Sequence, residues 1–229
     1  MKKILSVTFL ICSFFLNAQE YPEVKIADSQ IRKISSKTVL GQEYELQILL
    51  PSNYQNSTKK YPVLYVMDSQ WDFTLAKSIY GQLYFDGFIP EIIIVGVTWG
   101  GEKPNPSILR ARDYTPTNIG STASTGGAAV FLDFMKTELF PFVETNYRAE
   151  NNNRTLMGCS LGGLFTLYTL FTHSDMFDGY IAASPAISWD NGILNQFEKQ
   201  FSEKQLTKPV RVYMTVGDVE MGKNDFEKF

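Results

Sequence analysis

The stretch Leu156-Met157-Gly158-Cys159-Ser160-Leu161-Gly162-Gly163 decides the fold of this chain. The apolar residues before the first glycine have β character, and a second apolar run at 164–171 follows the last one. Strand, sharp turn and helix in this order are the context in which G-x-S-x-G forms a nucleophile elbow. The turn strains the backbone at Ser160, and the flanking positions must be glycine because a Cβ there would strike the neighbouring strand or helix. Ser160 is the predicted nucleophile; the alternative is a glycine-rich turn in which Ser160 only caps the helix.

Length and composition predict one α/β domain behind a targeting segment. The chain has 229 residues and ordinary fractions of apolar, aromatic and charged residues. Residues 1–18 combine a basic start, an apolar core from Ile4 to Leu16 and a small-residue site ending at Ala18, which predicts a cleavable signal peptide. We therefore expect residues 19–229 to form a secreted or periplasmic domain without stable membrane insertion. The sequence carries no signal for the oligomeric state.

The charge balance and the few histidines and cysteines exclude several classes of function. The formal net charge is −3, and it falls to −5 without Lys2 and Lys3 because 19 basic side chains then face 24 acidic ones. A mildly acidic chain without a basic cluster argues against a nucleic-acid partner. Beyond the signal peptide the chain has one cysteine, Cys159, and one histidine, His173, so we expect no disulfide, no metal and no cofactor.

Apolar runs alternate with helical segments along the rest of the chain. The predicted strands lie at 24–39, 44–51, 61–68, 91–99, 154–157, 180–186 and 210–217. The predicted helices lie at 73–84, 127–147, 164–171 and 191–204. Residues 100–125, rich in Gly, Pro, Ser and Thr, are expected to form a long functional loop. Unbroken apolar runs indicate strands buried on both faces, so we predict an α/β fold with a mostly parallel central sheet and helices on both faces.

Five motifs make residues 40–220 resemble the putative esterase family of α/β-hydrolases, nearest to the enterochelin-type siderophore esterases and the esterase D-like proteins. The motifs are Pro62-Val63-Leu64-Tyr65-Val66-Met67-Asp68, Arg112-Asp113-Tyr114-Thr115-Pro116-Thr117, the elbow, Ala183-Ser184-Pro185 and Val216-Gly217-Asp218-Val219-Glu220. The resemblance implies the α/β-hydrolase fold. It also implies hydrolysis of carboxylic esters, siderophore-type or carbohydrate-linked, through an acyl-enzyme on Ser160.

The resemblance also assigns the groups that stabilise the reaction. The oxyanion hole would use the backbone N–H of Leu161 and, from the loop after the 61–68 strand, the backbone N–H of Gln70. The family usually has Asp-Gly before that second position, and this chain has Asp68-Ser69. The acid of the triad is expected just after the last strand, at Glu220, with Asp218 as the second choice.

Three further residues are expected to contact the substrate. Trp71, Arg112 and Trp189 are placed by the predicted elements on loops at the carboxyl ends of strands. Open α/β sheets bind ligands at that edge. We therefore expect these three side chains to line an acyl or aromatic pocket for a small-molecule or polysaccharide-linked ester.

The base that a serine nucleophile needs is missing from this pattern. His173 lies at the far end of the elbow helix, about 18–20 Å from Ser160 at 1.5 Å per residue, whereas a general base must come within about 3 Å. In these hydrolases the order is Ser, acid, His. We therefore expect the chain to stop before its last helix, last strand and catalytic histidine. It would then be a fragment or a prematurely terminated copy; a complete protein with another base is the third possibility.

Two other functions use the same residues. One is a binding protein of the α/β-hydrolase fold that holds a ligand without turnover. The other is acyl transfer from the serine to an alcohol acceptor.

Overall fold

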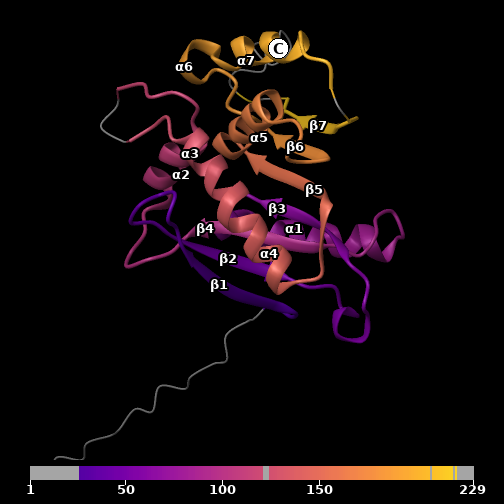
Figure 1. Ribbon diagram of the computed structural model, residues 1–229. Coiled ribbons are helices and arrows are strands. Elements are labelled where there is room, and N and C mark those ends of the chain that lie inside the picture. Colours follow the sequence, from indigo (N-terminus) through magenta and orange to yellow (C-terminus); the bar gives the residue numbers. More distant parts are fainter. Residues whose placement is uncertain (1–25, 121–123, 207, 219, 221–229) are drawn as a thin grey trace, which may run out of the picture.

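The computed structural model describes residues 26–120, 124–206, 208–218 and 220, and the predicted signal peptide lies outside them. Seven strands form one sheet in the order β1-β2-β4-β3-β5-β6-β7 (Figure 1). Their bounds are β1 Ser29–Ser35, β2 Glu43–Leu49, β3 Tyr61–Val66, β4 Ile93–Trp99, β5 Ala149–Cys159, β6 Gly179–Ala183 and β7 Arg211–Thr215. The predicted α/β fold with a mostly parallel sheet is confirmed.

The sheet is antiparallel at one end and parallel elsewhere. β1 pairs with β2, and β2 with β4, in antiparallel fashion, which suits segments that alternate apolar and polar residues. From β4 through β3, β5 and β6 to β7 all pairs are parallel. In the central pair Leu64 of β3 lies opposite Thr155 of β5. The carboxyl ends of the parallel strands therefore meet along one edge of the sheet.

Helices cover both faces, and the direction of each crossover decides which face. The helices are α1 Ser69–Phe85, α2 Pro106–Tyr114, α3 Ala128–Phe134, α4 Phe140–Asn146, α5 Leu161–Thr172, α6 Trp189–Gly192 and α7 Leu194–Ser202, with a short 3-10 turn η1 at Tyr54–Asn56. The chain moves one way along the sheet from β3 through α1 to β4, and the other way from β5 through α5 to β6. Since such crossovers are right-handed, α1 lies on the face opposite α5 (Figure 1).

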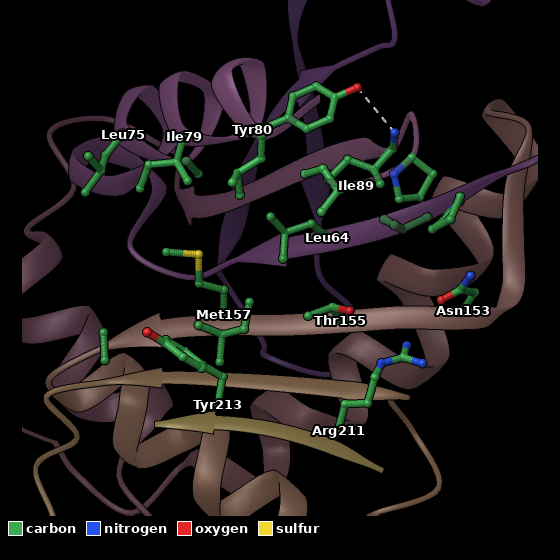
Figure 2. A pocket seen from close by; sticks show the side chains of 18 of the residues that line it. Leu64, Leu75, Ile79, Tyr80, Ile89, Asn153, Thr155, Met157, Arg211 and Tyr213 are labelled. Carbon is green, nitrogen blue, oxygen red and sulfur yellow. Dashed lines mark hydrogen bonds between the residues drawn. The ribbon is translucent and has the colours of Figure 1, made fainter. Parts of the chain in front are cut away.

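The two faces are buried to different extents. On the α5 face a large cluster of aromatic and aliphatic side chains forms the main core, with Tyr44, Tyr65, Phe131 and Phe165 fully buried. On the α1 face a smaller cluster surrounds Phe73. Beside that cluster, a groove of about 910 Å³ runs between α1 and the strands β3, β5, β6 and β7 (Figure 2). No helix among the described residues is both long and apolar enough to cross a membrane.

Two elements differ from their predicted form. Residues 100–125 are not a continuous loop, because α2 begins at Pro106 after Asn105, whose side chain accepts a hydrogen bond from the Ile108 N–H at 3.4 Å. The predicted helix at 127–147 is present, but its middle, η2 at Met135–Leu139, is a π-helix in which the Phe140 N–H bonds the carbonyl of Met135. This wider turn directly precedes Pro141, which has no N–H to continue the α-helical ladder.

Candidate active site

Ser160 stands where β5 ends and α5 begins, in the strained backbone that the elbow predicts. Its φ is 56° and its ψ is −116°, a region that non-glycine residues rarely adopt. The surrounding backbone holds it there: the Ser160 N–H donates to the Ala183 carbonyl at 3.0 Å. The Ser160 carbonyl accepts from the N–H groups of Leu164 at 2.9 Å and Ala186 at 3.1 Å. The side chain is exposed, so a reactive hydroxyl would be accessible at this edge of the sheet.

The glycines around Ser160 are there because the backbones touch. A Cβ added to Gly158 would lie 2.3 Å from the carbonyl carbon of Gly162. One added to Gly163 would lie 2.9 Å from the Cα of Pro185, in the loop after β6. Both distances are shorter than any van der Waals contact. The expectation that a side chain flanking the serine would strike its neighbours is therefore confirmed at Gly158, whereas a Cβ on Gly162 would make tight contacts of 3.2 Å and more.

Two helix N-termini converge beside Ser160. Leu161 is the first residue of α5 and Gln70 the second residue of α1, so neither N–H has a partner within its own helix. The helix starts are adjacent, because a Cβ on Gly162 would lie 3.2 Å from Oδ2 of Asp68 and 3.4 Å from the Cβ of Met67. Unpaired N–H groups at helix N-termini can stabilise a developing oxyanion. The oxyanion roles of Leu161 and Gln70 stay predictions.

The serine in place of the usual glycine after Asp68 fits because the neighbouring strand makes room. Ser69 is buried, and a Cβ on Gly96 of β4 would lie 2.5 Å from the Cβ of Ser69. Asp68 takes the left-handed conformation, with φ 52° and ψ 41°, which lets α1 begin at once after β3. The Gln70 side chain accepts a hydrogen bond from the Thr98 hydroxyl at 2.6 Å.

Glu220, the first choice for the acid, is tied to the loop after β6. Its Oε1 accepts from the Ser184 hydroxyl at 2.6 Å and from the Gly217 N–H at 2.8 Å. Ser184 has a φ of 42°, and its own N–H donates to the Thr215 carbonyl at 2.7 Å. Ser184 directly follows Ala183, which accepts the Ser160 N–H, so Glu220 belongs to the same edge as the elbow. Asp218 lies in the turn after β7.

The three predicted substrate-contact residues are in different surroundings. Trp71 is 56% exposed and lies in the first turn of α1 rather than on a loop. Trp189 starts α6, is half-buried, and donates from Nε1 to the Thr117 hydroxyl at 3.2 Å. Arg112 lies in α2, so its placement on a loop is wrong, as it is for Trp71 and Trp189. α1 and α6 begin before the helices predicted at 73–84 and 191–204, and α2 lies within the predicted loop at 100–125.

The Arg112 guanidinium is engaged in the interior. It donates to both carboxylate oxygens of Asp113, at 2.6 and 2.9 Å, and to the Gln42 side chain at 3.0 Å. Asp113 is 2% exposed and also accepts from the Tyr44 hydroxyl and the Trp99 indole, each at 2.7 Å. These contacts make Arg112 part of a packed network, and its predicted contact with substrate stays a prediction.

Asp68 and Arg110 form an ion pair beside the elbow that no motif in the sequence predicts. Arg110 lies one turn from the end of α2, and its guanidinium forms a two-point ion pair with the Asp68 carboxylate. Burial raises the pKa of Asp68, although the Arg110 charge opposes this. This ion pair depends on α2, which brings Arg110 to the start of α1. Because the sequence predicts a loop at 100–125, it does not predict the pair.

No described residue is placed to act as the base for Ser160. His173 is the C-cap of α5 and is exposed, and its ring contacts the hydroxyl of the preceding Thr172. The 12 residues of α5 separate it from Ser160 by about 18 Å. The prediction that His173 lies too far away to take the serine proton agrees with this geometry.

Comparisons with known proteins place these features in one family. The family model described as "Putative esterase" matches residues 36–227. The ferri-bacillibactin esterase BesA of Bacillus subtilis is 30% identical over 210 residues, covering 85% of this chain and 72% of that protein. The siderophore triacetylfusarinine C esterase of Aspergillus fumigatus is 31% identical, covering 71% of this chain and 58% of that protein. The crystal structure of the BES protein from Bacillus cereus has a TM-score of 0.80 at 30% identity, over 92% of this chain and 84% of that one.

Proposed function

This chain belongs to the putative esterase family of carboxylic ester hydrolases, and on that premise we propose that it cleaves siderophore-type esters through an acyl-enzyme on Ser160. In the first step the Ser160 oxygen attacks the ester carbonyl and a base takes the hydroxyl proton. The alcohol leaves with a proton, and water then releases the acid and restores the serine. The product pair is therefore one carboxylic acid and one alcohol.

The observation that carries the proposal is the backbone of Ser160. A serine at φ 56° and ψ −116°, held by three backbone hydrogen bonds beside two helix N-termini, has the backbone expected of the nucleophile in an elbow. A serine that only capped α5 would accept a hydrogen bond from the first turn of the helix, and the Ser160 side chain accepts none there. The N–H groups of Leu161 and Gln70 would hold the oxyanion.

Names of relatives support the substrate class. The ferri-bacillibactin and triacetylfusarinine C esterases are both named for siderophore esters, and each is 30% or more identical to this chain. The exposed Trp71 lies next to the elbow helix start and offers a flat apolar surface to an acyl group. Glu220, held by Ser184 and Gly217, would orient the base.

The proposed chemistry requires a base that the described residues do not contain. In the family order Ser, acid, His, that base would follow Glu220 in sequence. We further propose export, on the predicted signal peptide at 1–18, so that the ester would be met outside the cytoplasm.

The test uses the full-length product of the gene, incubated with a fluorophosphonate probe, a p-nitrophenyl ester and a ferric trilactone siderophore. Ser160-dependent labelling and release of free acid, lost in Ser160→Ala and kept in the exposed control Ser188→Ala, would support the proposal. Absence of labelling and turnover would overturn it.

A further inference from the structure

One arginine contacts both segments that carry the predicted oxyanion hole, at Asp68 and at Cys159. Arg110 donates from Nε to Oδ1 of Asp68 at 3.0 Å and from Nη2 to Oδ2 at 2.8 Å. The same Nη2 lies 3.4 Å from the carbonyl oxygen of Cys159, the residue before Ser160. The first contact fixes the start of α1, which carries the Gln70 N–H. The second, weaker contact reaches the end of β5, which carries the nucleophile.

The partner of Arg110 is a buried carboxylate next to the predicted oxyanion position. Asp68 is 2% exposed, and its Oδ2 lies 3.2 Å from where a Cβ of Gly162 would be, at the N-terminus of α5. That is beside the position where the ester oxygen would gain negative charge. An unpaired carboxylate there would repel the oxyanion, because charges interact strongly where water is excluded. The Arg110 charge compensates it.

Two neighbours hold the pair in one geometry. The Tyr114 hydroxyl accepts the Asp68 N–H at 3.1 Å, from the last residue of the helix that carries Arg110. On the other side, the guanidinium carbon of Arg110 lies 5.7 Å from the centre of the Trp71 ring. The Arg110 side chain is 16% exposed.

We propose that Arg110 is a positioning residue for ester hydrolysis: it clamps the start of α1 against the elbow and neutralises Asp68 beside the oxyanion. The inference rests on the proposed function. Arg110 acts through Asp68 and the Gln70 N–H. A lysine would supply the charge but not the planar fork that bonds both carboxylate oxygens and reaches the Cys159 carbonyl.

The first test separates kcat from KM in the hydrolytically active form of the protein with a p-nitrophenyl ester. Arg110→Met should lower kcat about 100-fold while KM changes less than about threefold, since loss of one oxyanion donor costs about 10²–10³ in rate. Arg110→Lys should recover part of that loss. The matched control is Arg154→Met, whose side chain is also 16% exposed and pairs, from the middle of β5, with Glu144 of α4. It should keep kcat within about twofold. A kcat within threefold of wild type in Arg110→Met, or a loss carried by KM, would overturn the proposal.

The second test asks whether Arg110 and Asp68 act as a unit. In the Arg110→Met background, Asp68→Asn removes the uncompensated charge and should restore kcat about tenfold, because coupled residues are not additive. If the two single losses multiply in the double variant instead, the pair is not coupled and the proposal fails.

Hydrogen exchange distinguishes this proposal from the proposed function. If the wild-type protein shows no Ser160-dependent turnover, the proposed function is refuted. Hydrogen exchange then still tests whether Arg110 clamps the start of α1 against the elbow. Amides in the first turn of α1 should exchange at least tenfold faster in Arg110→Met than in wild type or Arg154→Met. Equal rates in all three proteins would overturn the clamp.

Discussion

Gly158 and Gly162 touch through their backbones across the elbow, so closely that a Cβ on the first would lie 2.3 Å from the carbonyl carbon of the second. The contact joins the end of β5 to the first turn of α5. The chain must therefore turn sharply within the three residues between the two glycines, and this explains the positive φ of Ser160. The strain at the predicted nucleophile is thus imposed by packing of strand against helix.

The Gly158–Gly162 contact predicts a severe effect of the smallest possible substitution. Gly158→Ala should destabilise the protein by about 3 kcal/mol or more, since overpacking of a rigid backbone contact has no flexible side chain to yield. The control is Gly81→Ala in α1, where a Cβ would meet nothing within 4 Å; it should stabilise by about 0.5–1 kcal/mol. Urea unfolding monitored by circular dichroism measures both. Equal stabilities of the two variants would contradict the packing explanation.

The buried network around Asp113 should be essential for stability. Asp113→Asn leaves the half-buried Arg112 without its counter-charge and should cost about 3 kcal/mol. The exposed control Asp175→Asn should stay within about 0.5 kcal/mol of wild type. Thermal and urea unfolding compare the variants, and an Asp113→Asn protein as stable as the control would show that the network contributes little.

Stability should depend on pH through Glu138. Burial alone would raise its pKa, but hydrogen bonds from Thr38, Lys37 and Ser36 outweigh this and hold the pKa below its ordinary value of 4.5. A depressed carboxyl pKa gives stability that is present above the unfolded-state pKa and is lost as pH falls through the folded-state pKa. Glu138→Gln should therefore be less stable than wild type at pH 7, and the difference should shrink at pH 3. A difference independent of pH in urea titrations would contradict this.

The Cys159 thiol should be unreactive although it adjoins the predicted nucleophile. Burial raises the pKa of Cys159, and the nearby carboxylates of Asp72 and Asp68 raise it further. Since the thiolate is the reacting form, iodoacetamide at pH 7.5 should alkylate Cys159 at least tenfold more slowly in the folded protein than in urea. Peptide mass spectrometry follows the reaction, and similar rates in both states would disprove the burial argument.

The geometry after β7 predicts which carboxylate is the acid. Glu220→Gln should lower kcat of the active form by about 10²–10⁴, as loss of an orienting carboxylate does in a serine triad. Asp218→Asn should lower it less than tenfold. Steady-state hydrolysis of a p-nitrophenyl ester decides between them, and the reverse order would assign the role to Asp218.

Much of this fold follows from local patterns in the chain. The apolar run ending at Val66 and the elbow at Ser160 are decided by periodicity and glycine spacing, which act over a few residues. α1 begins at Ser69, four residues before the predicted start at 73, because Asp68 takes a left-handed turn that is unusual for a non-glycine residue. α2 has a local start signal, the N-cap Asn105 followed by Pro106. The Gly, Pro, Ser and Thr content of residues 100–125 nevertheless favours a loop, so composition alone does not predict this helix.

The part of the site that escaped prediction depends on residues far apart in sequence. Arg110 and Asp68 are 42 residues apart, and neither belongs to a local pattern that points to the other. The same holds for Ser69, which fits only because Gly96 on the neighbouring strand lacks a side chain. Such relations follow from the order of strands in the sheet and the direction of α2, which no short stretch of sequence specifies.

The central position of β3 also affects synthesis of the protein. One edge of β3 can pair as soon as β4 has been synthesised. The other edge of β3 pairs with β5, and Thr155, the partner of Leu64, is synthesised 91 residues later. At about 5–20 residues per second, a ribosome takes roughly 5–18 s to bridge that interval. During those seconds a largely buried strand of the sheet has one open edge, so the nascent chain is a natural client for a holding chaperone until the elbow strand arrives.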